Sequence, residues 1–328
     1  MTLHIVPSTA LAEMVACDPC GERFGPMGPC SYLAVEVQGQ ISAHIEEWMK
    51  ALPCPVIAIG GPPRQAWADL VLTVRDALSS IARNIEQAPF AAMILVQQLR
   101  LAEHLPLPDA LICESLAYAT AQRSPDFEAW KQSAPSLAPQ PPIAAPLNVS
   151  RDRDRLNLTL NMPDRRNAID IAMRDALCEA LDLAILDTSI ERITLNAAGR
   201  CFSTGGAVEE FGSVTDPATA HAIRMARLPA RRLAKLRDRL CVHAQGATIG
   251  AGLEMGAFAA RFTCSADAWF QLPELRYGLI PGAGGTVSIS RRIGRHRTAL
   301  LALSMRRISA SDALAWGLVD AIIPEMEP

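Results

Sequence analysis

The second half of the chain repeats one pattern, in which a short apolar strand is followed by a glycine-rich turn and then by helical spacing of apolar residues. The glycine-rich turns lie at 199–206, 246–250 and 282–286. The strands are predicted at 192–196, 240–244 and 269–272, where apolar residues run without helical spacing. This alternation of strand, turn and helix predicts an α/β layer fold.

The start of this half shows both kinds of periodicity. Leu156, Leu158 and Leu160 alternate with polar residues, which predicts a strand with one buried face. Asn167 or Asp170 can then cap a helix. Its apolar stripe consists of Met173, Leu177, Ala180, Leu181 and Ala184.

A proline-rich segment divides the chain. Residues 131–147 contain five prolines and no helical or strand pattern, so we expect an extended, semi-rigid linker. The predicted organisation is an amino-terminal region at 1–131, a linker at 132–147 and a catalytic core at 148–328.

The amino-terminal region is less regular. Short strands are predicted at 32–37, 55–59 and 69–74, and helices from about 76 to 131. Ser124 followed by Pro125 indicates a helix cap with proline in the first turn.

Composition limits the class of protein. The chain has 328 residues, of which 50% are apolar and 20% charged, with a formal net charge of −3. This profile is typical of a globular protein and does not favour a nucleic-acid or membrane partner. No apolar run reaches the ~20 residues of a membrane span, and the first residues lack the pattern of a leader peptide, so we expect a cytoplasmic protein.

The cysteines indicate reduced thiols. Nine are scattered along the chain, an odd number that does not suggest a disulfide framework. Cys17 and Cys20 have the spacing of a metal-binding pair, but no second pair or suitable histidine follows. We therefore expect no metal and unpaired thiols in a loop.

Two glutamates, Glu254 and Glu274, lie 20 residues apart, each beside a glycine-rich turn. Carboxylates that converge on one pocket can move protons and activate water. Turns that open helices supply free N–H groups for a developing negative charge. The pattern indicates an enzyme that holds an oxyanion next to two acid/base groups.

The second half resembles the crotonase (enoyl-CoA hydratase/isomerase) superfamily in five stretches that occur in the family's order. They are Arg165–Ala168, Gly199–Gly206, Gln245–Glu254, Leu272–Thr286, and Ile308–Ala310 with Ala315–Val319. The resemblance implies a crotonase-like spiral of ββα repeats and a coenzyme A thioester as substrate, with no separate cofactor. It also implies a homo-oligomer, either a trimer or a dimer of trimers.

The resemblance assigns roles to individual residues. Glu254 would activate water for attack on Cβ, and Glu274 would deliver or remove the proton at Cα, so the implied activity is that of an enoyl-CoA hydratase, a lyase of acyl-CoA metabolism. The N–H groups of Thr204 and Ala251 would form the oxyanion hole. The residues implied to contact the substrate or its coenzyme A part are Arg166, Ser203, Gly205, Gly206, Ala207, Gly250 and Gly282.

The chain departs from the family pattern in two places. Ala207 stands where the family often has aspartate, and the chain stops at Pro328, shortly after the closing motif. Family members continue there with helices that pack the trimer and cap the acyl pocket. Residues 76–131 resemble those helices, and 52–61 with 68–72 resemble eroded core strands. We therefore expect a degenerate crotonase-like first unit whose helices complete the site of the same or a neighbouring subunit.

Several alternatives stay open at this point. The same fold hosts acyl-CoA isomerases, C–C bond hydrolases and non-catalytic subunits that bind coenzyme A thioesters. His243 lies in an apolar strand and is expected in the core, and Ser203 has no partners for a serine hydrolase. The basic stretch 224–239 is expected to be a solvated helix face or, like Arg166, a contact for the coenzyme A phosphates.

Overall fold

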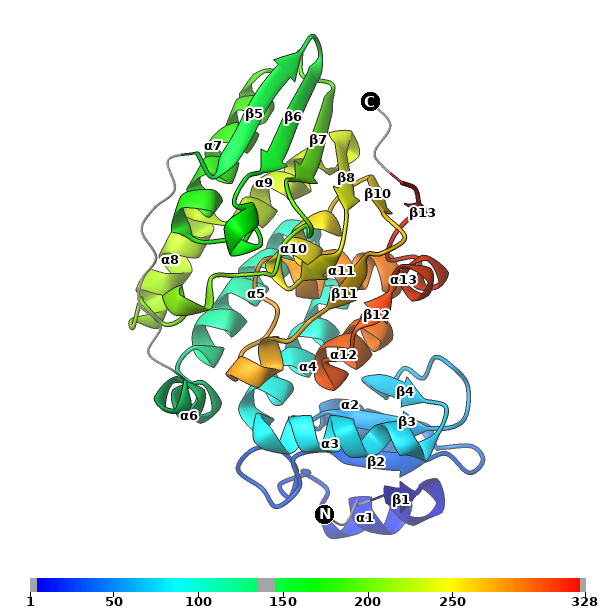
Figure 1. The fold of residues 1–328 in the computed structure, drawn as a ribbon. Helices are drawn as coiled ribbons and strands as arrows, with labels where there is room; N and C mark the ends of the chain where they lie inside the picture. Colours follow the sequence, from blue (N-terminus) through cyan, green and yellow to red (C-terminus); the bar gives the residue numbers. More distant parts are fainter. Residues whose placement is uncertain (1–4, 135–144, 325–328) are drawn as a thin grey trace.

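The computed structural model describes residues 5–134 and 145–324. They fold into three sheets surrounded by helices, with the amino-terminal sheet at one end of the molecule (Figure 1). The expected linker at 132–147 lies largely outside the described residues. Its flanks are described, because helix α6 reaches Ser133 and strand β5 starts at Leu147.

The amino-terminal sheet is parallel throughout, and its strands follow the order β1-β2-β3-β4. The strands are β1 (Ile5–Pro7), β2 (Leu33–Glu36), β3 (Val56–Ile59) and β4 (Leu70–Leu72), with helices α1 (Leu11–Cys17) and α2 (Ala43–Ala51). The three strands predicted in this region are confirmed, and β4 is shorter than predicted. Cys17 and Cys20 are exposed free thiols.

Four helices follow this sheet, as the sequence predicts. They are α3 (Leu78–Gln87), α4 (Pro89–His104), α5 (Leu107–Ala121) and α6 (Pro125–Ser133). The side chain of Ser124 accepts a hydrogen bond from the N–H of Phe127, which confirms the predicted cap of α6.

A six-stranded sheet with the order β13-β10-β8-β7-β6-β5 forms the centre of the second half. Its pairs are parallel except for β5 with β6. The strands are β5 (Leu147–Asp152), β6 (Arg155–Leu160), β7 (Arg192–Ala197), β8 (Leu240–Ala244), β10 (Arg261–Cys264) and β13 (Ala321–Ile322). His243 on β8 is buried beside Thr263, as expected for a core residue.

A smaller sheet with the order β12-β11-β9 lies next to the glycine-rich turns. Its strands are β9 (Ala247–Ile249), β11 (Trp269–Gln271) and β12 (Ile308–Ser309). The helices of this half are α7 (Ile171–Leu186), α8 (Pro217–Arg227), α9 (Pro229–Leu236), α10 (Ala251–Gly256), α11 (Gly285–Ile293), α12 (Arg295–Ser304) and α13 (Ala310–Trp316). Asp170 caps α7 by accepting from the N–H of Met173, whereas Asn167, the other candidate cap, is buried.

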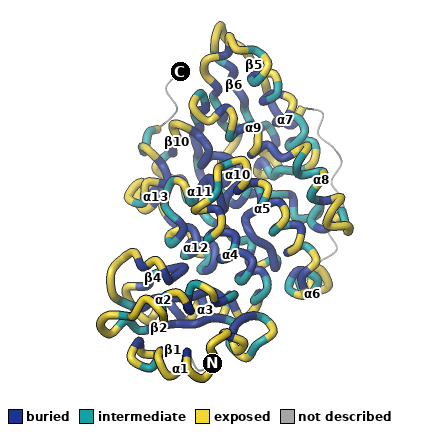
Figure 2. The backbone as a smooth tube through the Cα atoms, turned by 180° about the vertical axis from the view of Figure 1, so that it is seen from behind, coloured by how far each residue is buried: buried dark blue, intermediate teal, exposed yellow. Residues whose placement is uncertain are grey.

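The two halves share one hydrophobic core. It extends from Ile57 and Leu70 of the first sheet through Leu95 of α4 and Leu111 of α5 to the strands and helices of the second half. Figure 2 shows this continuity as buried backbone around α4, α5, α10 and α12. Because so much apolar surface is covered by the other half, α4 and α5 depend on the second half for their burial.

Candidate active site

The glycine-rich turn at 203–206 is held by a dense set of hydrogen bonds. The N–H of Ser203 donates to Ala247 O, the N–H of Thr204 to Arg166 O at 3.1 Å, and the N–H of Gly205 to the hydroxyl of Ser203. The N–H of Ala207 donates to Ile169 O. Within this run Gly206 alone keeps an N–H without an acceptor among the described residues.

This pairing corrects the expected role of Thr204. A backbone N–H that already donates to a carbonyl is not available to a substrate oxygen, so Thr204 is not the oxyanion donor. Ser203 also differs from the expectation, because it is fully buried and its hydroxyl donates to Asn167 O at 2.7 Å. Ser203 shapes the turn and does not reach a substrate.

The second turn ends at Gly250, which has a φ of +48°. This left-handed conformation favours glycine, and a Cβ there would lie 2.6 Å from Glu274 Oε1. Ala251 is the first residue of α10, where N–H groups have no acceptor within the helix. The Ala251 N–H is unpaired among the described residues, and Gly205 lies directly beside it.

Glu254 is buried on α10, one turn after Ala251. Its Oε2 accepts hydrogen bonds from the N–H groups of Ala283 and Gly285 at 2.6 and 2.8 Å. Burial, together with the nearby charges of Glu274 and Glu114, raises the pKa of this carboxyl well above its usual range. The two N–H donors oppose that shift and favour the anion.

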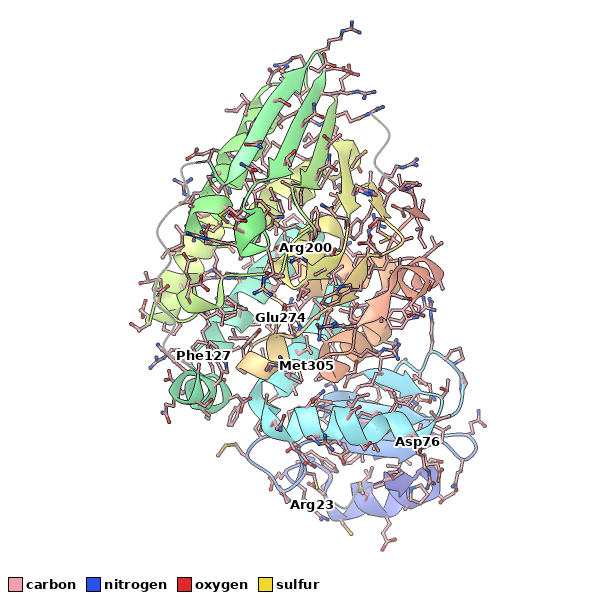
Figure 3. The ribbon with its side chains drawn as sticks, in the orientation of Figure 1. Arg23, Asp76, Phe127, Arg200, Glu274 and Met305 are labelled. Atoms are coloured by element: carbon pink, nitrogen blue, oxygen red, sulfur yellow. The ribbon has the colours of Figure 1, made fainter. Side chains whose placement is uncertain are left out.

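Glu274 begins the short 3-10 helix Glu274–Tyr277 and lies near the centre of the molecule (Figure 3). Its Oε2 is shielded from solvent and has no partner among the described residues. Burial, with a smaller contribution from Glu114, raises its pKa to about 8. A carboxyl group in such surroundings keeps its proton at neutral pH.

A cavity of about 330 Å³ brings these groups together. Its wall includes Glu254, Glu274, Ala251, Gly206 and Ala207. Most of the remaining wall is apolar and includes Ile169, Phe211, Ile223, Leu228, Met255, Leu279 and Ile280. The site therefore combines the carboxyl groups of Glu254 and Glu274 with two free N–H groups and a largely apolar wall, which Asp170, Arg174, Glu210 and Arg224 also line.

Two adjoining cavities of about 810 and 620 Å³ are lined by arginines and by a smaller number of acidic residues, of which Asp164 lines both. Both are lined by Arg166, Thr204, Trp269 and Arg307, and the guanidinium of Arg307 lies 4.0 Å from the Trp269 ring centre. The smaller of the two shares Gly206 and Ala207 with the carboxylate cavity. A region with a small excess of arginines over carboxylates and with an aromatic surface thus lies next to the acid/base groups.

Helix α5 of the first half forms part of the carboxylate cavity. Tyr118 and Gln122 line it, and a Cβ at Gly282 would overlap the Tyr118 ring. Arg224 of α8 donates to Gly282 O and lies 4.3 Å from the centre of the Tyr118 ring. Arg224 was expected on a solvated face or at a phosphate, but it points inward.

Sequence reasoning missed Glu114 and Tyr118 as residues of the site. An indication was available for Glu114, because it lies on the same stripe of α5 as Ala110 and Leu111 and is the only charged residue on that stripe. An acidic residue on an apolar stripe is rarely buried without a partner. No pattern in the sequence identifies that partner.

Comparisons with known proteins identify relatives of the second half of the chain. The family model described as enoyl-CoA hydratase/isomerase matches residues 155–327. A 2,3-dehydroadipyl-CoA hydratase from Escherichia coli K12 is 34% identical over 178 residues, which cover 54% of this chain and 69% of that protein. A 1,2-epoxyphenylacetyl-CoA isomerase from the same organism is 31% identical over 174 residues, covering 52% and 66%.

Solved structures show the same fold. AtuE from Pseudomonas aeruginosa has a TM-score of 0.51 and 26% identity, with 55% of this chain and 71% of that chain covered. The enoyl-CoA hydratase subunit I from Geobacillus kaustophilus has a TM-score of 0.51, 24% identity and coverage of 55% and 69%. The chain spans about two thirds of the length of the curated relatives it matches.

Proposed function

Since the chain belongs to the enoyl-CoA hydratase/isomerase family, we propose that it hydrates a 2-enoyl-CoA thioester with Glu254 as base and Glu274 as acid. The observation that carries this proposal is the convergence of both carboxyl groups and the free N–H groups of Gly206 and Ala251 on one cavity. Hydration needs all of these groups, because water must lose a proton, Cα must gain one and the thioester oxygen must carry negative charge between the two events.

The hydrogen bonds divide the roles of the two glutamates. The pair shares protons as a coupled unit. Burial raises the pKa of both carboxyl groups, but Glu254 also accepts two N–H groups near the amino terminus of α11, where a helix stabilises negative charge, and for this reason we place the anion on Glu254. Glu274 Oε2 has no donor among the described residues, so the proton belongs on Glu274.

The reaction follows from these charge states. Glu254 takes a proton from water as the hydroxyl oxygen bonds to Cβ, and the C=C electrons move toward the thioester carbonyl. The N–H groups of Gly206 and Ala251 hold the resulting enolate oxygen. Glu274 then protonates Cα, which restores the carbonyl and leaves Glu254 protonated and Glu274 ionised. Exchange of protons with solvent returns both to their starting states.

The coenzyme A part of the substrate is proposed to occupy the two adjoining cavities. Arg166 and Arg307 line both, Arg200 lines the larger one, and Arg165 and Arg276 line the smaller one. Their charges suit phosphate groups, and Trp269 offers a flat surface. No cofactor beyond the coenzyme A of the substrate is included in this proposal.

The helices of the first half are proposed to do what the carboxy-terminal helices do in the family. Support comes from Tyr118 and Gln122, which close the cavity within the same chain. A trimer or dimer of trimers, and a location in the cytoplasm, remain proposals based on the family. The helices at 5–134 and 145–324 all lack the length and apolar content that a membrane crossing requires.

The test is hydration of crotonyl-CoA, measured as loss of the enoyl-thioester absorbance. Wild-type protein is expected to consume the absorbance, and Glu254→Gln and Glu274→Gln are expected to be impaired. A rate that neither substitution changes would overturn the mechanism. Two isomerases are among the relatives at 31% identity, so a 3-enoyl thioester belongs in the same assay, where a rise in absorbance would identify double-bond migration.

A further inference from the structure

A third buried carboxylate, Glu114, lies beneath the candidate active site and comes from helix α5 of the first half. Its side chain has no exposed surface. It belongs to none of the motifs of the second half, and the turn that it contacts is 170 residues further along the chain. Burial of an acidic group is costly unless hydrogen bonds compensate.

The compensation comes from the turn that opens α11. Glu114 Oε1 accepts from the N–H of Gly284 at 2.7 Å, and its Oε2 accepts from the N–H and hydroxyl of Thr286 at 3.0 and 2.6 Å. Glu254 accepts from the alternate N–H groups, those of Ala283 and Gly285. Four successive N–H groups are thus divided in alternation between two carboxylates.

Burial raises the pKa of the Glu114 carboxyl, and its hydrogen-bond partners oppose that shift and favour the ionised form. Every hydrogen bond to it comes from an N–H or O–H donor, so a proton on the carboxyl would have no acceptor in this set. Gln98 of α4 donates to Thr286 Oγ1 at 3.2 Å, which directs the threonine hydroxyl hydrogen toward Glu114. The guanidinium of Arg224 lies 4.0 Å from Glu114 and supplies a counter-charge.

The turn itself has little intrinsic rigidity. Ala283, Gly284 and Gly285 are small, and Gly284 has a φ of +102°. Flexible residues of this kind keep one conformation only when their surroundings hold them. Glu114 holds the side of the turn that faces α5, and Glu254 lies on the other side.

We propose that Glu114 is a positioning residue that fixes the 283–286 turn and, through its N–H groups, the carboxylate of Glu254. This inference rests on the proposed hydration, in which Glu254 is the base. It assigns to the first half of the chain a part in orienting the catalytic base, in addition to covering the cavity.

The direct test is Glu114→Gln, with Asp109→Asn as the matched control. Glutamine has the same size, but its amide nitrogen would face one of the N–H groups and leave it unpaired. Asp109 is an acidic residue on the exposed face of the same helix. For crotonyl-CoA hydration we expect kcat to fall ~10- to 100-fold in Glu114→Gln, because small displacements of a catalytic group have effects of that size. The KM of Glu114→Gln should stay within about twofold of wild type. The kcat of Asp109→Asn should also stay within about twofold of wild type.

A double-variant cycle separates positioning from a general structural role. If Glu114 acts through Glu254, adding Glu114→Gln to Glu254→Gln should lower the residual rate by less than about twofold. If the rate of the double variant instead falls by the product of the two single-variant losses, Glu114 acts independently of Glu254 and the proposal is overturned. An unchanged kcat in folded Glu114→Gln protein would overturn it as well.

Hydrogen exchange of the 279–290 segment tests the inference without relying on activity. Exchange at the turn should speed up in Glu114→Gln and not in Asp109→Asn, since the turn loses an acceptor. If the wild type hydrates no enoyl thioester, the proposed function fails, while the exchange data still decide whether Glu114 holds the turn. Unchanged exchange would overturn that role.

If Glu114→Gln does not fold, Thr286→Val is a second variant that tests the same role of Glu114. It removes the hydroxyl donor to Glu114 and keeps all four N–H groups of the turn. The expected result is a fall in kcat of about tenfold, since one hydrogen bond to a charged group is lost. A folded Thr286→Val protein with wild-type kcat would contradict the proposal.

Discussion

Trp130 of α6 packs edge-on against Tyr277, with ring centroids 5.3 Å apart. Tyr277 ends the short helix that begins with Glu274. Next to it, Gly278 has a φ of +66°, and a Cβ there would overlap the backbone of Asp126 and Phe127. The first half of the chain therefore contacts both glutamate-bearing regions, α6 at Glu274 and α5 at the turn that holds Glu254.

These contacts predict that the second half does not function without the first. A chain of residues 147–328 would expose the faces of α11 and α8 that α4 and α5 now cover, along with the Glu274 turn. We expect it to aggregate or to lack hydratase activity. The measurement is sedimentation or gel filtration together with the crotonyl-CoA assay.

Co-production of residues 1–134 as a separate chain is the control for this truncation. Because the contacts are non-covalent, we expect the two pieces to associate and recover activity. If residues 147–328 alone were folded and fully active, the prediction that the first half contributes to the site would be wrong.

Glu254→Gln should reduce the hydration rate by about 10²- to 10⁴-fold, the usual size of a general acid/base contribution. The amide keeps the shape of the side chain but cannot take a proton from water. Binding of butyryl-CoA, a saturated thioester that cannot react, should change little by calorimetry. Loss of binding in parallel with rate would point to a disturbed cavity instead.

Ala251→Pro tests the oxyanion hole at a position suited to the substitution. Proline is well tolerated at the first residue of a helix, and Ala251 begins α10. The change removes one N–H donor, so we expect kcat to fall about 10²- to 10³-fold. Ala251→Gly keeps the N–H and should stay close to wild type; equal losses in both variants would argue against the role of this donor.

The raised pKa of Glu274, about 8, predicts a pH-dependent rate. Hydration needs the protonated acid, so kcat should decline as pH rises through this value and Glu274 ionises. The alkaline limb should disappear in Glu274→Gln, whose residual rate cannot depend on that proton. An unchanged limb in Glu274→Gln would assign the titration to another group.

The raised pKa of Glu274 also makes the free energy of unfolding depend on pH. The folded state binds the Glu274 proton more tightly than the unfolded state, whose pKa is near 4.5. The contribution of Glu274 to the free energy of unfolding therefore decreases as pH rises from about 4.5 to about 8. Denaturant titrations of wild type and Glu274→Gln across this window should converge at low pH and diverge at high pH, with the variant more stable.

Asp69 joins the amino-terminal sheet to the helices of the core. It is 2% exposed, accepts from Arg100 Nε at 2.8 Å and from the N–H of Val56, and lies 3.6 Å from Arg295. Asp69→Asn would remove the carboxylate that pairs with Arg100 and the buried one of the two carboxylates that pair with Arg295, so we expect a loss of about 3–5 kcal/mol in the free energy of unfolding. Glu103→Gln, which alters an exposed partner of Arg295, should cost less than about 1 kcal/mol in the same urea titration.

Local features of the site could be predicted from neighbouring residues. The strand alternation at Leu156, Leu158 and Leu160, the cap at Ser124 and the helical spacing after 76 each depend on a few adjacent positions. Glu254 and Glu274 were identified for the same reason, since each belongs to a local pattern with its turn. Periodicity and capping act over one or two turns of chain, and a sequence displays them directly.

The oxyanion donor and the orientation of the base depend on contacts between distant segments. From the sequence Thr204 was expected to be the donor, but its N–H pairs with the carbonyl of Arg166, and the free N–H of this turn belongs to Gly206. Glu114 acquires its partners when α5 packs on α11. Whether a polar group is free or paired depends on which atoms surround it, so the sequence supplied the reactive groups and the packing of its two halves selected which of them face the cavity.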